Sequence, residues 1–205
     1  MKVIGFVSQK GGSGKSTLAV HIAVAAEESK QRVAIVDTDP QKSVLTWSEQ
    51  REAKTPVVVA APGGEIAQVL DAARGDGMSL VVIDSAPHTD VDASRVASVS
   101  DLVIVPCRPA AFDLSAVAQT VEMIKALKRE AVLVLSACPP RAPEIDEARE
   151  VLKGYGLPVY GGQITDRRAF ARALVGGRSV TEFDSGSKAA EEIRALWKWI
   201  HRRMK

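Results

Sequence analysis

The chain has 205 residues, 46% of them hydrophobic, which is enough to bury the core of one domain without a second. Its formal net charge is only +2, so any binding to nucleic acid has to come from a local basic patch rather than from overall charge. The two cysteines, Cys107 and Cys138, form no C-x-x-C pair, a pattern typical of reduced thiols and not of a disulfide framework or structural metal site.

The chain opens directly with a predicted strand. The apolar run from Val3 to Val7 predicts a buried strand, and the N-terminus lacks the longer apolar h-region of a signal peptide. No later apolar run approaches the roughly 20 residues of a membrane span. We therefore expect a single cytoplasmic domain that comprises residues 1–205.

A glycine-rich segment joins this strand to a predicted helix, in which apolar residues recur with helical spacing from Leu18. Glycines let the backbone turn its N–H groups inward, and the start of a helix adds further donors and a partial positive charge. This arrangement binds phosphate groups. The predicted phosphate-binding residues are Lys10, Gly11, Gly12, Ser13, Gly14, Lys15, Ser16 and Thr17.

The phosphate-binding segment is a variant of a known pattern. It reads K-G-G-x-G-K-[ST] rather than G-x-x-x-x-G-K-[ST], because Gln9 stands where the first glycine is usual. Lys15 is expected to reach the β- and γ-phosphates of a nucleotide. The hydroxyl of Ser16 is expected to bind Mg²⁺.

Two aspartates follow the next predicted strand, residues 32–36. Ligands of open α/β sheets bind at the carboxyl ends of such strands. We expect Asp37 to support the Mg²⁺ shell and Asp39 to orient the attacking water for in-line transfer. The alternative is that Asp39 only caps a helix that starts near Gln41.

A third acidic position follows the predicted strand 80–84. The strand is continuously apolar and delivers one carboxylate, that of Asp84, beside the phosphate loop, where it is expected to hold Mg²⁺ through a water. Residues 85–90 occupy the position of a second switch segment. His88, within it, is either a sensor or an ordinary exposed loop residue.

The remaining patterns complete an alternation of strands and helices, which predicts an α/β fold with a doubly wound, mostly parallel sheet and helices on both faces. The last helix carries an apolar stripe that is expected to pack on the domain, although its basic end also suits DNA or a membrane surface. Further strands are predicted at 56–60, 102–106 and 131–135, and helices at 16–30, 43–53, 65–74, 113–128, 143–153 and 187–205.

These motifs resemble the deviant Walker A ATPases of the ParA/MinD family. Lys10 stands where the family has its marker lysine, residues 37–41 resemble the family's D-x-D-P-Q segment, and residues 164–170 resemble a segment before its penultimate helix. The resemblance covers nearly the whole chain. It is closest to the short ParA proteins without an added N-terminal DNA-binding domain, because the phosphate loop begins within a few residues of Met1.

The resemblance implies a P-loop NTPase that uses ATP and Mg²⁺ and acts as a partition motor. Lys10 would cross a dimer interface to the ATP of the second subunit, so that ATP binding and homodimerisation are one event. Lys10, Lys15 and Asp39 are the catalytic residues that it implies. The dimer would bind nucleoid DNA without sequence preference, and a centromere-binding, ParB-like partner would stimulate slow hydrolysis and thereby position a plasmid, chromosome or other cargo.

The resemblance also implies that arginines touch the DNA backbone, with solvated surface arginines as the alternative. A MinD-like membrane-associated ATPase of the division site is a second functional hypothesis. A metabolic or iron–sulfur P-loop enzyme is a third, which the separate positions of the two cysteines disfavour. The candidate DNA-binding residues are Arg167, Arg168, Arg172, Arg202 and Arg203.

Overall fold

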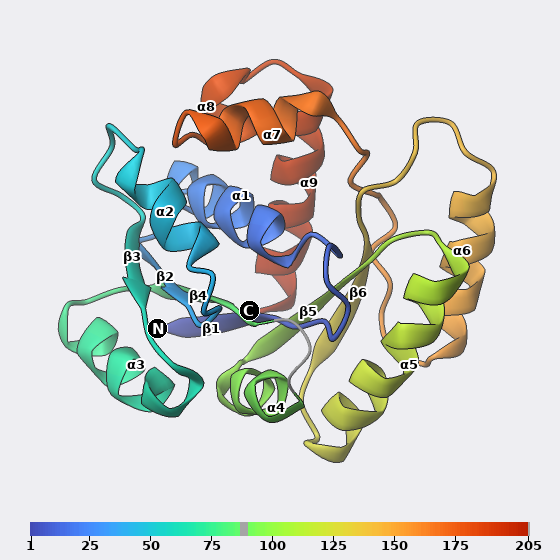
Figure 1. Cartoon of the computed structure of the whole chain (residues 1–205), viewed down its shortest axis with the longest axis horizontal. Coiled ribbons are helices and arrows are strands. Elements are labelled where there is room, and N and C mark those ends of the chain that lie inside the picture. Colours follow the sequence, from blue (N-terminus) through green and yellow to red (C-terminus); the bar gives the residue numbers. More distant parts are fainter. Residues whose placement is uncertain (87–89, 205) are drawn as a thin grey trace.

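A parallel β-sheet forms the centre of the protein (Figure 1). The computed structural model describes residues 1–86 and 90–204, and within these residues six strands pair in the order β3-β2-β4-β1-β5-β6. Every pairing between neighbouring strands is parallel. The strands are β1 (Lys2–Phe6), β2 (Val33–Asp37), β3 (Val57–Ala60), β4 (Leu80–Asp84), β5 (Leu102–Cys107) and β6 (Ala131–Leu135).

Burial of the strands follows their place in the sheet. β2, β4, β5 and β6 are buried along their whole length, as expected for strands that are covered on both faces. β3 lies at the edge and alternates between exposed and half-buried residues, with Val57 and Val59 about two-fifths exposed. The continuous apolar runs in the sequence therefore predicted the central strands correctly.

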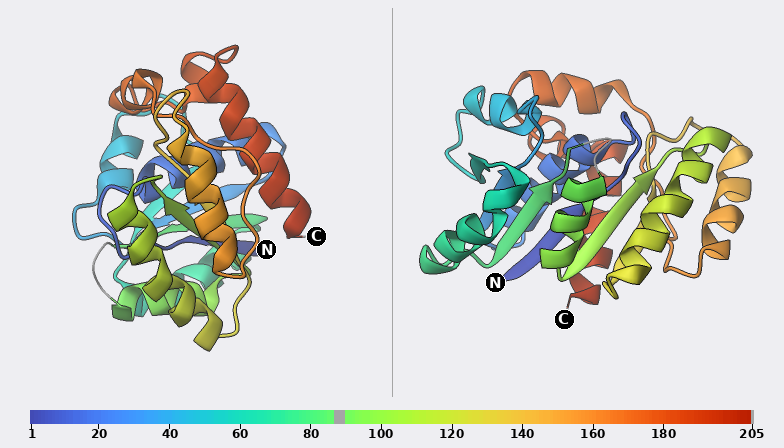
Figure 2. Two further views of the ribbon diagram at one scale, coloured as in Figure 1. Left: turned by 90° about the vertical axis from the view of Figure 1, so that its right-hand side faces the viewer. Right: turned by 60° about the horizontal axis from the view of Figure 1, so that its bottom comes forward.

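Helices cover both faces of the sheet (Figures 1 and 2). The helices fall into two groups, one on each face. Side chains of the first group pack with Ile4, Ile35 and Val82 of the sheet, and those of the second group pack with Val3, Val36 and Val81. The doubly wound architecture predicted from the sequence is thus confirmed. The first group is α1 (Lys15–Glu28), α2 (Ser43–Glu49), α7 (Arg168–Val175), α8 (Val180–Phe183) and α9 (Lys188–Arg203), and the second is α3 (Ile66–Gly75), α4 (Asp90–Val99), α5 (Ala111–Ala126) and α6 (Glu144–Gly154).

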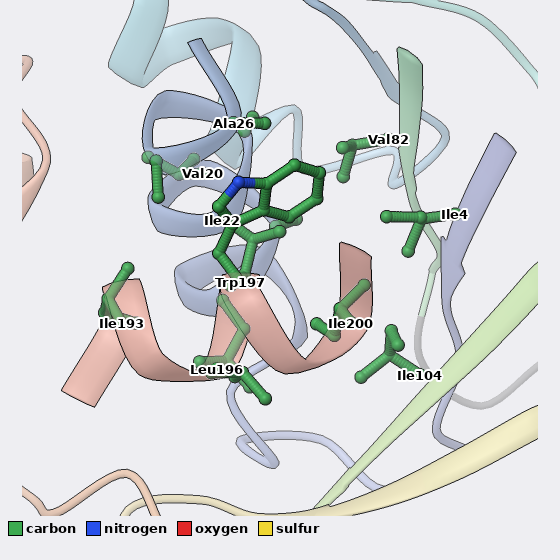
Figure 3. Close-up of a cluster of buried hydrophobic side chains, with 14 of the residues drawn as sticks. Ile4, Val20, Ile22, Ala26, Val82, Ile104, Ile193, Leu196, Trp197 and Ile200 are labelled. Carbon is green, nitrogen blue, oxygen red and sulfur yellow. The ribbon is translucent and has the colours of Figure 1, made fainter. Parts of the chain in front are cut away.

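The last helix, α9, belongs to the core of the domain. Trp197 is 4% exposed, and its indole N–H donates to Ser29 Oγ over 2.9 Å. Figure 3 shows Trp197 between α1 and the sheet. The expectation that the apolar stripe packs on the domain is confirmed. The other buried members of the stripe are Ile193, Leu196 and Ile200.

Two helices, α4 and α8, were not predicted, α7 was implied only by the family segment that precedes a penultimate helix, and α2 is shorter than predicted. α8 has only four residues and is held by a capping box in which Ser179 and Glu182 take part, so it is too short to produce a helical periodicity. α4 also escaped detection, and α2 ends at Glu49 instead of continuing to residue 53. The predicted switch segment includes His88, which lies outside the described residues.

The strand register brings three chain segments to one edge of the sheet. Phe6 at the end of β1 and Asp37 at the end of β2 both pair with Asp84 at the end of β4. The phosphate loop begins directly after β1, so it emerges beside the ends of β2 and β4. Open parallel sheets bind their ligands at this edge.

Candidate active site

The phosphate loop has the backbone of an anion cradle. Gly12 and Gly14 have φ values of +72° and +95°, a left-handed conformation that favours glycine. Gly14 is the N-cap of α1, and its carbonyl accepts the N–H of Leu18 at 2.9 Å. The amide groups before Leu18 therefore lie in the first turn, where helix N–H groups lack intrahelical acceptors and attract anions.

A cavity of about 600 Å³ opens above this loop. Its volume is within the range of small-molecule and cofactor sites. The side chain of Lys10 is exposed at the start of the loop and is not part of the cavity wall. The wall consists of Gly11, Gly12, Ser13, Gly14, Lys15, Ser16, Thr17, Leu18, Asp39, Gln41, Ser43, Arg108, Ser136, Ala137, Ile164, Thr165, Asp166, Arg167, Phe170, Ala171 and Leu174.

Asp84 lies fully buried at the end of β4, and neither of its carboxylate oxygens has a hydrogen-bond partner among the described residues. Burial raises the pKa of Asp84 to about 7; the neighbouring Ser16 hydroxyl and the Lys15 ammonium oppose this shift, whereas Asp37 and Asp39 add to it. An unpartnered buried carboxylate is costly unless a cation compensates it. The position fits Mg²⁺.

Lys15 is the cation of the cradle. It is 6% exposed, and its Nζ lies 3.5 Å from the carbonyl oxygen of Lys10. Burial lowers the pKa of Lys15, and the charges of Asp84 and Asp39 raise it. Among the described residues, no group of three or more His, Cys, Asp or Glu side chains could hold a metal alone.

Asp37 has a structural role that the sequence did not reveal. Its Oδ2 accepts the N–H groups of Val44 at 2.9 Å and Leu45 at 3.0 Å, and its Oδ1 accepts the N–H of Asp39 at 3.1 Å. The amides of Val44 and Leu45 belong to the first turn of α2, so Asp37 caps that helix. Its contribution to the Mg²⁺ shell stays a prediction.

Asp39 lines the cavity and is half-buried. Its Oδ1 accepts the N–H of Gln41 at 2.9 Å, before α2 begins at Ser43. The alternative interpretation, in which Asp39 caps this helix, is therefore wrong, because Asp37 supplies the cap. Asp39 lines the cavity together with the phosphate loop, and its water-orienting role stays a prediction.

Ser136 and Arg108, which are not among the predicted site residues, also belong to the cavity wall. The hydroxyl of Ser136, which follows β6, donates to the carbonyl of Ser13 at 2.6 Å and so braces the phosphate loop. Arg108 follows β5, is exposed, and lies beside Gly12, where a Cβ would be 3.7 Å from Arg108 Nη2. Their position at the carboxyl ends of strands was the signal that could have identified them.

The five candidate DNA-binding arginines do not form one surface. Arg167 lines the cavity and pairs with Glu192 at 2.9 Å, and the exposed Arg168 and Arg172 continue from it along α7. Arg202 and Arg203 are exposed at the other end of the molecule, where Arg203 lies near the first residues of β5 and β6. The first group lies at the carboxyl edge of the sheet and the second near the starts of β5 and β6, so each is a distinct candidate surface.

The cysteines considered for the iron–sulfur hypothesis are buried, and Trp199, considered for the membrane hypothesis, is half-buried. Cys107 and Cys138 are at most 1% exposed, and burial raises the pKa of each thiol to about 12. Trp199 is half-buried with its ring 5.1 Å from that of Tyr160. In the described part of the chain, none of the helices has the length and apolar content needed to cross a bilayer.

Comparisons with known proteins agree with this geometry. The chain matches the family described as "CobQ/CobB/MinD/ParA nucleotide binding domain" over residues 4–180. "Maintenance of carboxysome distribution protein A" of Gloeobacter kilaueensis is 33% identical over 208 residues, which cover 97% of this chain and 92% of that protein. "Protein ParA" of Rhizobium radiobacter is 31% identical over 202 residues, which cover 93% of this chain and 90% of that protein.

A solved structure shows the same fold. The septum site-determining protein MinD of Pyrococcus horikoshii, complexed with Mg-ADP, has a TM-score of 0.78 and 17% identity to this chain, and the match covers 97% of this chain and 95% of that one. The phosphate loop, the buried aspartate beside it and the family match all indicate a nucleotide-binding domain. The chain belongs to the CobQ/CobB/MinD/ParA family of nucleotide-binding domains, as a relative of ParA, MinD and the carboxysome distribution proteins.

Proposed function

We propose that the protein is a Mg²⁺-dependent ATPase that dimerises on ATP and positions a cargo on DNA. The observation that carries the ATPase part is the buried, unpartnered carboxylate of Asp84 beside Ser16, Lys15 and the glycine cradle. Such a charge is stabilised by a divalent cation, and the cradle would bind the nucleotide phosphates that share this cation.

Each residue has a defined task in this proposal. The amides of the loop and Lys15 would hold the β- and γ-phosphates, while Ser16 and Asp84 would hold the metal. Bound Mg²⁺ would neutralise charge on the phosphate oxygens. Asp39, at the cavity wall, would orient the water that attacks the γ-phosphorus in line with the leaving oxygen.

In this proposal the exposed Lys10 links the two subunits of the dimer. Because its side chain is exposed and does not line the cavity of its own subunit, it could reach a nucleotide that is held by a second copy. ATP binding would then join two subunits. The relatives named above, a carboxysome distribution protein and a ParA protein, support a cargo-positioning role. A ParB-like partner on the cargo would stimulate hydrolysis.

DNA binding is the part of the proposal that one experiment tests most directly. Binding to random-sequence duplex DNA is measured with ATP, with ADP and without nucleotide, each across a salt series. We expect binding only with ATP and a steep decrease with salt, because lysine and arginine contacts to phosphates release counterions. Binding by the nucleoid-associated dimer should show no preference for sequence.

Charge-reversal variants then identify the surface. One variant carries Arg168→Glu with Arg172→Glu, and the other Arg202→Glu with Arg203→Glu, because the two pairs lie at opposite ends of the molecule. Each variant must keep ATP hydrolysis for a loss of DNA binding to be attributed to its surface. Absence of DNA binding by the unaltered protein under every condition would refute the DNA-based mechanism, and anionic liposomes would be tested next.

A further inference from the structure

Arg167 is held in place more firmly than a residue that binds DNA requires. Its Nη2 lies 2.9 Å from Glu192 Oε1, and its side chain is only 31% exposed. Its Nε is buried and has no hydrogen-bond partner among the described residues. The guanidinium group therefore has a fixed position, with its exposed part at the cavity wall.

Glu192 organises the surroundings of this arginine. Besides Arg167, it accepts the backbone N–H and the hydroxyl of Thr165, each at 2.9 Å. Glu192 projects from α9, which the core holds rigidly, onto the segment that precedes α7. Three donors on one carboxylate fix the orientation of the arginine, as a supporting hydrogen bond does in a preformed site.

The position of Arg167 within the cavity points to a ligand. The cavity has a reacting end, where Asp39 lies near the phosphate loop and Asp84. A nucleotide whose γ-phosphate lies at that end must extend its nucleoside away from it. β2, which ends before Asp39, and β6, which ends before Ala137, lie on opposite sides of β1 in the strand order, and Thr165 forms a bridge with Cys138 beside Ala137. The cavity wall on the β6 side therefore includes Ala137 and Thr165, with Ile164 and Arg167 next to Thr165 in the chain, and it combines apolar surface with a few polar groups, as is usual for sites that bind small molecules.

The charge of Arg167 favours the same assignment. Its ion pair with Glu192 already compensates the positive charge, which weakens its attraction for phosphate. A guanidinium group is planar, stacks on aromatic rings and donates hydrogen bonds in its own plane. A neutral purine ring has a flat face and several acceptor nitrogens, so it suits the exposed part of this charge-compensated guanidinium better than DNA phosphate does.

We propose that Arg167 contacts the purine nucleoside end of the bound nucleotide and that Glu192 is its positioning residue. This inference rests on the proposed nucleotide binding and changes the expected role of Arg167 from DNA contact to nucleotide contact. The two neighbouring arginines, Arg168 and Arg172, stay candidates for DNA because both are exposed.

The test compares two ligands that share the triphosphate but differ in the nucleoside. Dissociation constants for Mg²⁺-ATP and Mg²⁺-tripolyphosphate are measured by calorimetry. The proteins are the unaltered chain, Arg167→Gln, Glu192→Gln, the double variant, and Arg168→Gln as the matched control. Arg167→Lys is added because it keeps the charge for Glu192 but lacks the planar group. Thermal melting confirms that each variant is folded.

We expect Arg167→Gln and Arg167→Lys to weaken ATP binding about tenfold and to leave tripolyphosphate binding unchanged. Glu192→Gln should give a smaller loss of the same kind. It should add nothing in the double variant, because it acts through Arg167. Arg168→Gln should change neither constant. DNA binding by Arg167→Gln at saturating ATP should equal that of the unaltered protein.

Several outcomes would overturn the inference. Equal weakening of ATP and tripolyphosphate binding would show that Arg167 contacts phosphate. Unchanged ATP binding in both Arg167 variants would show that Arg167 does not contact the nucleotide. Lost DNA binding at saturating ATP would return it to the DNA surface. If the unaltered protein binds neither ligand, the proposed nucleotide function fails instead, which is a distinguishable result.

Discussion

A buried histidine makes the stability of this protein depend on pH. His21 is 0% exposed in α1, its Nδ1 accepts the N–H of Val180 at 3.2 Å, and it lies 3.0 Å from Ser179 Oγ. Burial lowers the pKa of His21 from the ordinary 6.5 to about 3, and the charge of Glu182 opposes this shift only weakly. The folded protein therefore holds His21 neutral at pH values where an unfolded chain would protonate it.

The size of the effect follows from the two pKa values. At pH 5 the histidine of an unfolded chain is about 97% protonated, whereas His21 in the folded protein stays neutral. The stability that neutral His21 contributes is fully present above pH 6.5 and is lost as the pH falls towards 3. Between pH 7.5 and pH 5 the loss amounts to about 2 kcal/mol.

The assay is urea unfolding of the unaltered protein and of His21→Asn at pH 7.5 and at pH 5. Asparagine places an acceptor oxygen near the position of Nδ1 but does not titrate, so it keeps a partner for the N–H of Val180. The substitution lowers stability by a constant amount because it leaves a cavity. Other titrating groups, such as Asp84, are present in both proteins, so their contributions cancel in the difference.

We expect the unaltered protein to lose about 2 kcal/mol more than His21→Asn when the pH falls from 7.5 to 5. Equal losses in the two proteins would show that His21 titrates normally or that its ring is reached by water. Either result would refute the argument that burial keeps this ring neutral. An unchanged m-value at both pH values is needed for the comparison.

Three further predictions test the site and the fold. Lys10→Ala should keep nucleotide binding by the monomer but abolish ATP-dependent dimers, as measured by light scattering; persistent dimers would contradict its intersubunit role. Asp39→Ala should still dimerise with ATP but hydrolyse it at least a hundredfold more slowly, given what positioned catalytic groups contribute, and unchanged phosphate release would remove it from catalysis. Gly177→Ala should lower the free energy of unfolding by about 2 kcal/mol or more, since Gly177 has a φ of +64° and a Cβ there would be 2.5 Å from the Gln50 carbonyl oxygen. Gly154→Ala, where a Cβ meets nothing within 4 Å, is the matched control and should be neutral or slightly stabilising in chemical denaturation.

The predictions made from sequence succeeded where the signal is local. Residues 80–84 were recognised as a buried strand because a strand covered on both faces is apolar at every position. The phosphate loop was recognised because its glycines, Lys15 and Ser16 stand at fixed spacings between a strand and a helix. Both patterns depend on neighbours within a few residues, so they can be read without the fold.

The predictions were incomplete where a residue's role depends on a distant partner. The sequence did not reveal that Asp37 accepts N–H groups from the first turn of α2, because this contact depends on the direction in which α2 leaves the sheet. His21 had no predicted role, and its partner Ser179 lies 158 positions further along the chain. Ser136, which braces the phosphate loop, is 123 positions from Ser13.

The sequence by itself determined the sheet architecture and the existence of a phosphate loop, because repeating apolar patterns and a short motif specify them locally. Only the tertiary structure decided how the five arginines divide. Folding places Arg167 on the cavity wall beside Glu192, and the rest on two separate surfaces. The sequence does not show the role of an arginine, because that role depends on whether the fold places an anion, an aromatic ring or solvent next to its guanidinium group.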